Sequence, residues 1–173
     1  MGDRSDQVNI RNYRTDDLAA CRALWVELTE WHRQIYDSPQ IGGTDPGRKF
    51  DEHLERVGHE QIWLATSGGD VVGLVGVIPG ESASELEPIV VRERWRGRGI
   101  GRQLAESVIG EARAAGLRQL LTRPVARNAP AIRFFHGLGF DALGQLELVL
   151  DFRPPSEQVW RPGATIADRD LRV

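Results

Sequence analysis

The stretch Arg96-Gly97-Arg98-Gly99-Ile100-Gly101 follows an apolar run, Leu86 to Val91, and opens a segment with helical periodicity, Leu104 to Ala115. Its glycines lack the Cβ atoms that would hold a ligand away from the backbone. The first N–H groups of a helix have no partner within the helix and lie at the positive end of its dipole. This junction between strand and helix therefore predicts a site for phosphate groups.

Two common phosphate-binding loops do not fit this stretch. A Walker loop needs Gly-Lys-Ser/Thr after four intervening residues, and the segment has no such triplet. A dinucleotide fingerprint needs glycine at the position of Leu104, and it usually sits on the first strand of its fold rather than beyond residue 90. The pattern that remains is Arg-x-x-Gly-x-Gly, formed by Arg96, Gly99 and Gly101.

That pattern resembles the coenzyme A pyrophosphate motif of the GCN5-related N-acetyltransferases (GNAT). A second block, Asn128 to Phe140, resembles a later segment of the same family, in which an asparagine precedes a short helix that ends in Gly-Phe. The two blocks occur in the family's order and separation. The resemblance is strong over residues 85–150, extends to residues 8–80 by pattern alone, and implies acetyl-CoA as co-substrate.

Length and composition fit one domain of a cytoplasmic enzyme. The chain has 173 residues, of which 40% are hydrophobic, so we expect a single domain over residues 1–152 and a tail of unknown packing over residues 153–173. No apolar run approaches 18 residues and no basic and apolar leader is present, so neither a membrane span nor secretion is predicted. Cys21, the single cysteine, lies on an apolar helix face and is predicted to be buried.

The net charge of −3 gives no overall attraction to nucleic acid, although residues 92–102 include a local run of arginines. A nucleic-acid module would need interleaved aromatic residues or a reading helix, and this run offers only Trp95. The run is therefore assigned to the phosphates of one cofactor, and no nucleic-acid partner is expected. The histidines show no metal-binding spacing, so no metal is predicted.

Periodicity and turn residues predict an α/β fold with a mixed, mainly antiparallel twisted sheet of about six to seven strands flanked by about four helices. Strands are expected at residues 8–14, 61–66, 71–78, 85–92, 118–123 and 146–152, and helices at residues 15–36, 48–57, 99–115 and 128–138. The turn Ser67 to Asp70 predicts an antiparallel hairpin. Strand, helix and strand in succession predict that strands 85–92 and 118–123 are parallel.

The resemblance implies that the pantetheine arm binds the backbone of strand 85–92, in a gap where this strand parts from strand 118–123. Pro88 lacks the N–H of a strand ladder, so it marks either an edge strand or a bulge, and a bulge would splay the two strands. Asn128 is a helix N-cap, a cofactor contact or both. The residues expected to bind the cofactor are Ile89, Val90, Val91, Arg96, Gly97, Arg98, Gly99, Ile100, Gly101, Arg102, Asn128 and Phe135.

Acetylation of an amine requires a base for the amine proton, a donor for the carbonyl oxygen and a proton for the leaving thiolate. Alternation predicts that four residues share one strand face: Glu85, Glu87, Ile89 and Val91. Glu87 is the first candidate for the base and Glu85 the second, although both could be exposed or contact the acceptor without proton transfer. Many family members have tyrosine where Phe135 stands, and phenylalanine donates no proton. Another group then supplies the proton, or the thiolate leaves unaided.

The predicted function is transfer of acetyl from acetyl-CoA to a primary amine by direct attack in a ternary complex. The acceptor stays open among small amines, antibiotics, peptide N-termini and lysine side chains. Trp31, His32 and Tyr36, near the end of the first long helix, are expected to line the acceptor pocket, because the family varies this region to set its substrate. Helix packing explains Trp31 and Tyr36 equally well.

One rival function and one prediction of assembly accompany this prediction. Because position 135 is phenylalanine where many family members have tyrosine, the rival function is that of a coenzyme A sensor without turnover. The apolar segment Leu146 to Leu150 and the tail predict a homodimer formed by pairing or exchange between copies, with a monomer as the alternative.

Overall fold

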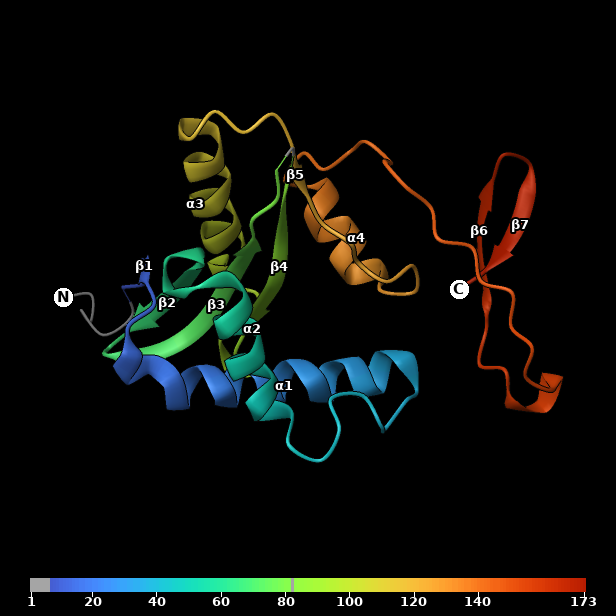
Figure 1. Ribbon diagram of the computed structural model, residues 1–173, viewed down its shortest axis with the longest axis horizontal. Coiled ribbons are helices and arrows are strands. Elements are labelled where there is room, and N and C mark those ends of the chain that lie inside the picture. Colours follow the sequence, from blue (N-terminus) through green and yellow to red (C-terminus); the bar gives the residue numbers. More distant parts are fainter. Residues whose placement is uncertain (1–6, 82) are drawn as a thin grey trace.

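The computed structural model describes residues 7–81 and 83–173. Five strands form one sheet in sequence order: β1 (Asn9–Asn12), β2 (Ile62–Ser67), β3 (Asp70–Ile78), β4 (Ser84–Val91) and β5 (Leu120–Leu121). Neighbouring strands are antiparallel except β4 and β5, which are parallel, as their separation by one helix predicts. A separate antiparallel pair near the C-terminus consists of β6 (Pro162–Ile166) and β7 (Arg169–Arg172) (Figure 1).

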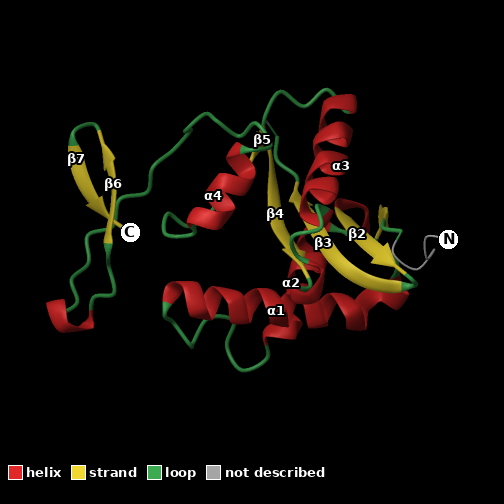
Figure 2. Ribbon diagram, turned by 180° about the vertical axis from the view of Figure 1, so that it is seen from behind, coloured by secondary structure: helices red, strands yellow, loops and turns green. Residues whose placement is uncertain are grey.

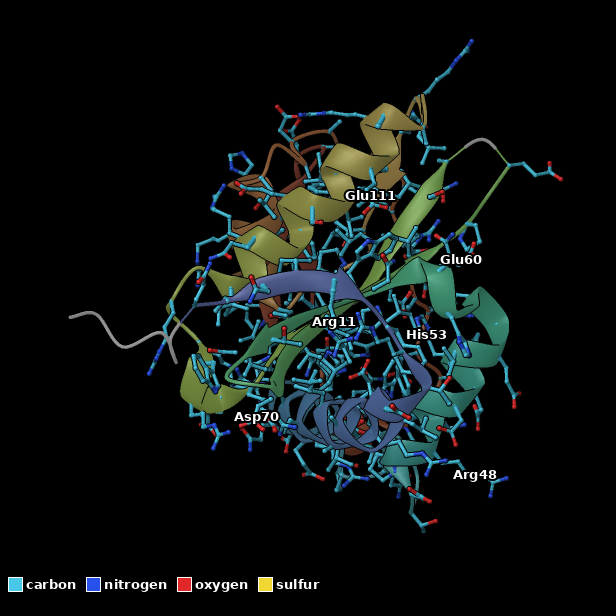
Figure 3. All side chains as sticks on the ribbon, turned by 90° about the vertical axis from the view of Figure 1, so that its left-hand side faces the viewer. Arg11, Arg48, His53, Glu60, Asp70 and Glu111 are labelled. Atoms are coloured by element: carbon cyan, nitrogen blue, oxygen red, sulfur yellow. The ribbon has the colours of Figure 1, made fainter. Side chains whose placement is uncertain are left out.

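Helices cover both faces of the sheet. Seen from the β1 edge, α3 (Ile100–Ala114) lies on one face, and α1 (Leu18–Tyr36) and α2 (Lys49–Val57) lie on the other (Figure 3). The fourth helix, α4 (Ala129–His136), lies beside β4 and β5 (Figure 2). This arrangement confirms the predicted α/β class with four α-helices flanking a mainly antiparallel sheet.

Each face of the sheet has its own apolar core. Alternate residues of a strand point to opposite faces, so Val75 packs in the cluster on the α3 side and Leu74 packs in the cluster on the α1 and α2 side. Cys21 is fully buried in the second cluster, and burial raises the pKa of its thiol to about 12. The predicted buried thiol is confirmed, and it stays protonated at neutral pH.

Strand β4 contains a bulge opposite Gly76. Val75 pairs with Ile89 while Val77 pairs with Leu86, so two residues of β4, Glu87 and Pro88, lie opposite one residue of β3. The bulge expected as one of two roles for Pro88 is therefore present. A Cβ on Gly76 would lie only 2.8 Å from the Glu87 carbonyl oxygen, so the close approach of the two backbones requires glycine.

The same bulge overturns the expected face of the two glutamates. Leu86, Ile89 and Val91 all pack against the cluster on the α3 side, which strict alternation along one strand would forbid. The register shift reverses the faces between residues 86 and 89. Glu85 pairs with Ile78, whose side chain packs in the cluster on the α1 and α2 side, so Glu85 does not share a face with Ile89.

The predicted strand at residues 146–152 is wrong. This segment leaves α4 and runs without a strand alongside it, and its apolar side chains are exposed, among them Leu148, Leu150 and Phe152. Alternating apolar residues favour a strand, but they do not determine which other strand the segment would pair with. Among the described residues the main sheet therefore has five strands rather than the predicted six to seven, and the separate pair β6 and β7 lies in the C-terminal tail, where no strand was predicted.

Among the described residues, no helix is long and apolar enough to cross a membrane.

Candidate functional site

The glycine-rich loop before α3 has an open backbone. Gly97 and Gly99 adopt positive φ angles of 76° and 79°, which side-chain-bearing residues rarely adopt. A Cβ at either position would meet no other atom within 4 Å, so the space beside the loop is free. Gly99 is the N-cap of α3 and offers no side-chain acceptor to the first N–H groups of the helix. These donors and the free space fit an anionic ligand.

Two arginines of the basic run support the fold. Arg92 forms an ion pair with Glu27 at 2.8 Å, and its Nε donates to the carbonyl oxygen of Val71. Arg102 pairs with Glu106 and donates to the carbonyl oxygen of Gly137, which ties α3 to the end of α4. Arg102, expected to bind the cofactor, therefore already has protein partners.

The two arginines within the loop are held by aromatic rings. The Arg98 guanidinium lies 4.8 Å from the Trp95 ring centroid, and that of Arg96 lies 5.2 Å from the Trp31 ring centroid. Among the described residues, neither guanidinium has a carboxylate partner. A hollow of about 350 Å³ borders this place, lined by Val8, Trp95, Arg98, Ile100 and Gln103. The loop thus presents two available positive charges beside free N–H groups.

Next to the loop, one edge of β4 is open. Strand β4 pairs with β5 only at Ser84 with Leu120 and at Glu85 with Leu121, so residues 86–91 have no described strand on that side. The expected parting of these strands is confirmed. A Cβ on Gly101 would lie 3.6 Å from Phe134 of α4 and 3.7 Å from Val91 of β4. Gly101 therefore faces the space between the open edge of β4 and α4.

The residues expected to bind the acceptor lie at the C-terminal end of α1, here called the α1 end (residues 31–36). Trp31 contacts Arg96 of the loop. The next residue, His32, stacks on Tyr36 with 5.2 Å between ring centroids, and burial lowers the pKa of His32. Arg127, just before α4, donates to the Tyr36 carbonyl oxygen at 3.4 Å. The α1 end therefore reaches from the glycine-rich loop to the start of α4, as Figure 1 shows.

Asn128 and Phe135 are both buried in α4. Asn128 caps the helix, because its Oδ1 accepts the N–H of Ala131 at 3.2 Å. Burial raises the pKa of the nearby Tyr36 hydroxyl, and the Asn128 side chain acts on that pKa in the opposite direction. Phe135 packs edge-on against Phe140 in the core cluster on the α3 side. The N-cap role of Asn128 is confirmed, and sequence reasoning missed that Tyr36 lies nearby.

The two candidate bases have different surroundings. Glu85 forms an ion pair with Arg123, which follows β5, and its side chain is only 13% exposed. Glu87 is exposed within the bulge, and no hydrogen bond or ion pair engages its carboxylate in the described part of the chain. The carboxylate free to accept a proton is therefore that of Glu87. Sequence reasoning did not identify Arg123 as the partner of Glu85, because no local pattern indicates which carboxylate an arginine after a strand will contact.

A buried histidine also lies at the bulge and was not predicted to contribute. His53 of α2 is 4% exposed, and its ring lies 5.1 Å from the Trp25 ring at an interplanar angle of 43°. Its Nε2 has no hydrogen-bond partner among residues 7–81 and 83–173, and it lies 2.8 Å from the point where a Cβ on Gly76 would stand. Burial, reinforced by the charge of Arg56, lowers the pKa of His53 to about 4. Its position on the apolar face of α2 was the available sequence signal.

The C-terminal tail contacts the same region as the α1 end. Arg127 donates to the carbonyl oxygens of Val159 and Val173, each at 3.2 Å, and Arg161 lies 3.9 Å from Asp37 in an exposed ion pair.

No group of three or more His, Cys, Asp or Glu side chains able to hold a metal ion occurs among the residues that the structure describes.

Comparison with known proteins identifies relatives of this chain. Residues 25–140 match the model of the acetyltransferase (GNAT) family. The L-methionine sulfoximine/L-methionine sulfone acetyltransferase of Pseudomonas paraeruginosa is 25% identical over 146 residues, covering 82% of this chain and 84% of the relative. N-acetyltransferase 8F1 of Rattus norvegicus is 30% identical over 101 residues, covering 55% of this chain. Since only 46% of that relative is matched, the chain spans less than half its length.

Solved structures share the fold. The ribosomal-protein-S18-alanine N-acetyltransferase of Escherichia coli superposes with a TM-score of 0.62 at 22% identity, covering 80% of each chain. At this identity the likeness extends to the fold alone.

Proposed function

The chain belongs to the acetyltransferase (GNAT) family, and on this premise we propose that it transfers acetyl from acetyl-CoA to a primary amine by direct attack in a ternary complex. The observation that carries the proposal is the pairing of an open, positively charged glycine-rich loop with an open edge of β4. The first suits the phosphates of coenzyme A, and the second offers backbone groups to its extended arm. The proposed acceptor is a primary amine.

The residues present fit acetyl-CoA. The N–H groups at the start of α3, with Arg96 and Arg98, would hold the pyrophosphate, and Gly97 and Gly99 leave room for it. The main chain of Ile89, Val90 and Val91 would bind the pantetheine arm along the open edge of β4. Ile100, Gly101, Asn128 and Phe135 would line the same space, while Arg102 acts there by joining α3 to α4. When bound, acetyl-CoA supplies the activated acetyl group.

The protein's part in the reaction is proton transfer and orientation. Glu87 is the proposed base because its carboxylate is unpaired, whereas Glu85 is held by Arg123. A backbone N–H beside the bulge would donate to the carbonyl oxygen as negative charge develops there. Trp31, His32 and Tyr36 would bind the acceptor, because the α1 end lies between the loop and α4. No metal ion takes part in this proposal.

The relatives are named for different acceptors, so the particular amine stays a proposal. The Pseudomonas relative is named for small amino-acid analogues, and the Escherichia coli structure for an alanine of a ribosomal protein. A screen of acetyl-CoA turnover across a panel of small amines, peptides with free N-termini and lysine peptides tests activity and acceptor together. Release of free coenzyme A thiol that depends on an amine supports an enzyme. Binding of coenzyme A without release by any amine would favour a sensor, the rival reading.

The assembly is proposed to be a homodimer. Residues 143–152 carry a row of exposed large apolar side chains that a second copy could cover: Leu143, Leu146, Leu148, Val149, Leu150 and Phe152. Strand β5 ends the main sheet and offers an unpaired edge for such a segment. Three further predictions are retained. Residues 1–152 form the catalytic domain, residues 153–173 form its tail, and the protein is located in the cytoplasm.

A further inference from the structure

A buried donor without a partner lies against the bulge of β4. The His53 ring is buried, and its Nε2 has no hydrogen-bond partner in the described part of the chain. Its Nδ1 lies 3.2 Å from Nη2 of Arg56. Burial lowers the pKa of the ring to about 4, so the ring is neutral at pH 7. Because a guanidinium can only donate, Nδ1 accepts from Arg56 and the ring hydrogen is on Nε2.

The acceptor beside this N–H belongs to the bulge. A Cβ on Gly76 would lie 2.8 Å from His53 Nε2 and 2.8 Å from the Glu87 carbonyl oxygen. Outside residues 75–77, the other atom nearest that point is Pro88 Cδ at 3.2 Å, which accepts no hydrogen bond. The donor and the carbonyl oxygen therefore flank one point. Glycine has no Cβ, so no side chain of residue 76 stands between them.

We propose that His53 is a positioning residue whose Nε2–H donates to the Glu87 carbonyl oxygen when coenzyme A or acetyl-CoA occupies the open edge of β4, an inference that rests on the proposed function. The peptide group between Glu87 and Pro88 has no N–H, because proline lacks it. Its carbonyl oxygen is thus the polar atom by which this peptide group can be held. A buried N–H without an acceptor is costly, which favours the paired state.

The hydrogen bond would set the direction of the proposed base. The carbonyl group and the side chain of Glu87 share one Cα, and a bulge re-aims the side chain that it carries. A cofactor bound to the main chain of residues 89–91 would fix the strand after the bulge, and His53 would fix the bulge itself. The ring is a firm support, because Arg56 holds its Nδ1 and the Trp25 ring lies 5.1 Å away. His53 is not the base, since its Nε2 already carries a hydrogen.

Two substitutions in the full chain test this role. His53→Leu removes the donor and keeps an apolar side chain in the core, so kcat should fall by about 10–100-fold through misplacement of Glu87. The Kd for coenzyme A and the melting temperature should change little, because an unpaired donor contributes no hydrogen bond to the fold. His53→Gln retains an N–H donor and should recover most of the rate. A purely structural role would move the melting temperature of His53→Leu instead.

The matched control is His59→Leu, which removes an exposed histidine that follows α2 and should leave kcat unchanged. A folded His53→Leu variant with wild-type kcat would overturn the inference and leave the proposed function intact. A His53→Gln variant as slow as His53→Leu would also overturn it, because the N–H donor would then not be the group that matters.

A measurement on the wild-type protein decides the matter even if His53→Leu does not fold. Protein labelled with ¹⁵N and ¹³C is titrated with coenzyme A, and the coupling across the hydrogen bond from His53 Nε2 to the Glu87 carbonyl carbon is recorded. Its appearance in the complex, with steady ring resonances of His59, supports the inference. Binding of coenzyme A without this coupling contradicts it. A complex that shows the coupling but acetylates no amine counts against the proposed enzyme alone, and failure to bind coenzyme A would overturn both.

Discussion

The guanidinium of Arg96 lies over the indole of Trp31, 5.2 Å from the ring centroid, so a residue expected to bind the acceptor contacts one expected to bind the cofactor. The Arg96 Nε also donates to the carbonyl oxygen of Val91, the last residue of β4. Arg96 thereby links the α1 end, the glycine-rich loop and the open edge of β4. The regions proposed for the acceptor and for the cofactor are therefore neighbours that share the Arg96 side chain.

Removal of the Trp31 ring should weaken cofactor binding. Trp31→Ala leaves Arg96 without its aromatic support, and an exposed cation–π contact of about 0.5–1 kcal/mol predicts a Kd for coenzyme A raised about twofold to fivefold. Trp31→Phe retains an aromatic face and should lie closer to wild type. Calorimetry of Trp31→Ala, of Arg96→Ala and of the variant that carries both substitutions completes a double-mutant cycle with the wild type. Strictly additive losses would mean that the two residues act separately.

A bulky residue at Gly101 should block the cofactor. Its Cβ faces the space between Val91 and Phe134, so the methyl groups of Gly101→Val enter the proposed path of the pantetheine arm. We expect coenzyme A affinity to fall by at least about tenfold, which is 1.4 kcal/mol. Gly110→Val makes the same change on the exposed side of α3, where a Cβ meets nothing within 4 Å. Equal affinity in the two folded variants would place the cofactor elsewhere.

The two glutamates of β4 should differ in their effect on turnover. Glu87→Gln removes the unpaired carboxylate and should lower turnover by about 10²–10⁴-fold, most strongly where the amine is protonated. Glu85→Gln breaks the ion pair with Arg123 and is expected to cost far less. Steady-state rates with acetyl-CoA across a pH range separate the two. Inactivation by Glu85→Gln alone reverses the ranking, and changes below about threefold in both variants would exclude a carboxylate base on β4.

His53 should make the protein sensitive to acid. Its pKa is about 4 in the folded state against an ordinary value of 6.5, because burial penalises the charged ring. Between these pH values the unfolded chain binds a proton that the folded chain excludes, so the free energy of unfolding decreases as pH falls from 6.5 to 4. Urea unfolding of His53→Gln should show a weaker pH dependence in this window. His136→Gln, at an exposed position of α4, should retain the wild-type slope.

The exposed segment should hold the dimer together. Leu148 and Leu150 are 73% and 76% exposed, and burying each leucine in a partner contributes about 1.5–3 kcal/mol. Leu148→Asp combined with Leu150→Asp should therefore convert a dimer into a monomer, as measured by light scattering at micromolar concentration. Glu147→Lys changes the polar residue that precedes Leu148 and should leave the dimer intact. A monomeric wild-type protein would refute the proposal directly.

Local features of the sequence determined most of the elements. The periodicity of α1, α2 and α3 and the turn between β2 and β3 reflect contacts between residues close in the chain, and the structure confirms them. The glycines of the loop before α3 could likewise be interpreted from the sequence, because a positive φ is a property of a single residue. Pro88 likewise indicated either an edge strand or a bulge, because proline lacks the backbone N–H of a strand ladder.

Tertiary structure alone decided which residues meet. The bulge at Glu87 and Pro88 shifts the register by one residue, and such a shift reverses the faces, so the alignment of Glu85 with Ile89 could not be predicted by alternation. The segment at 146–152 has the pattern of a strand, but pairing depends on a distant partner that no local pattern specifies. The hydrogen bond from Arg127 to the Tyr36 carbonyl oxygen joins residues far apart in the chain, and only the packing of α1 near α4 brings them together.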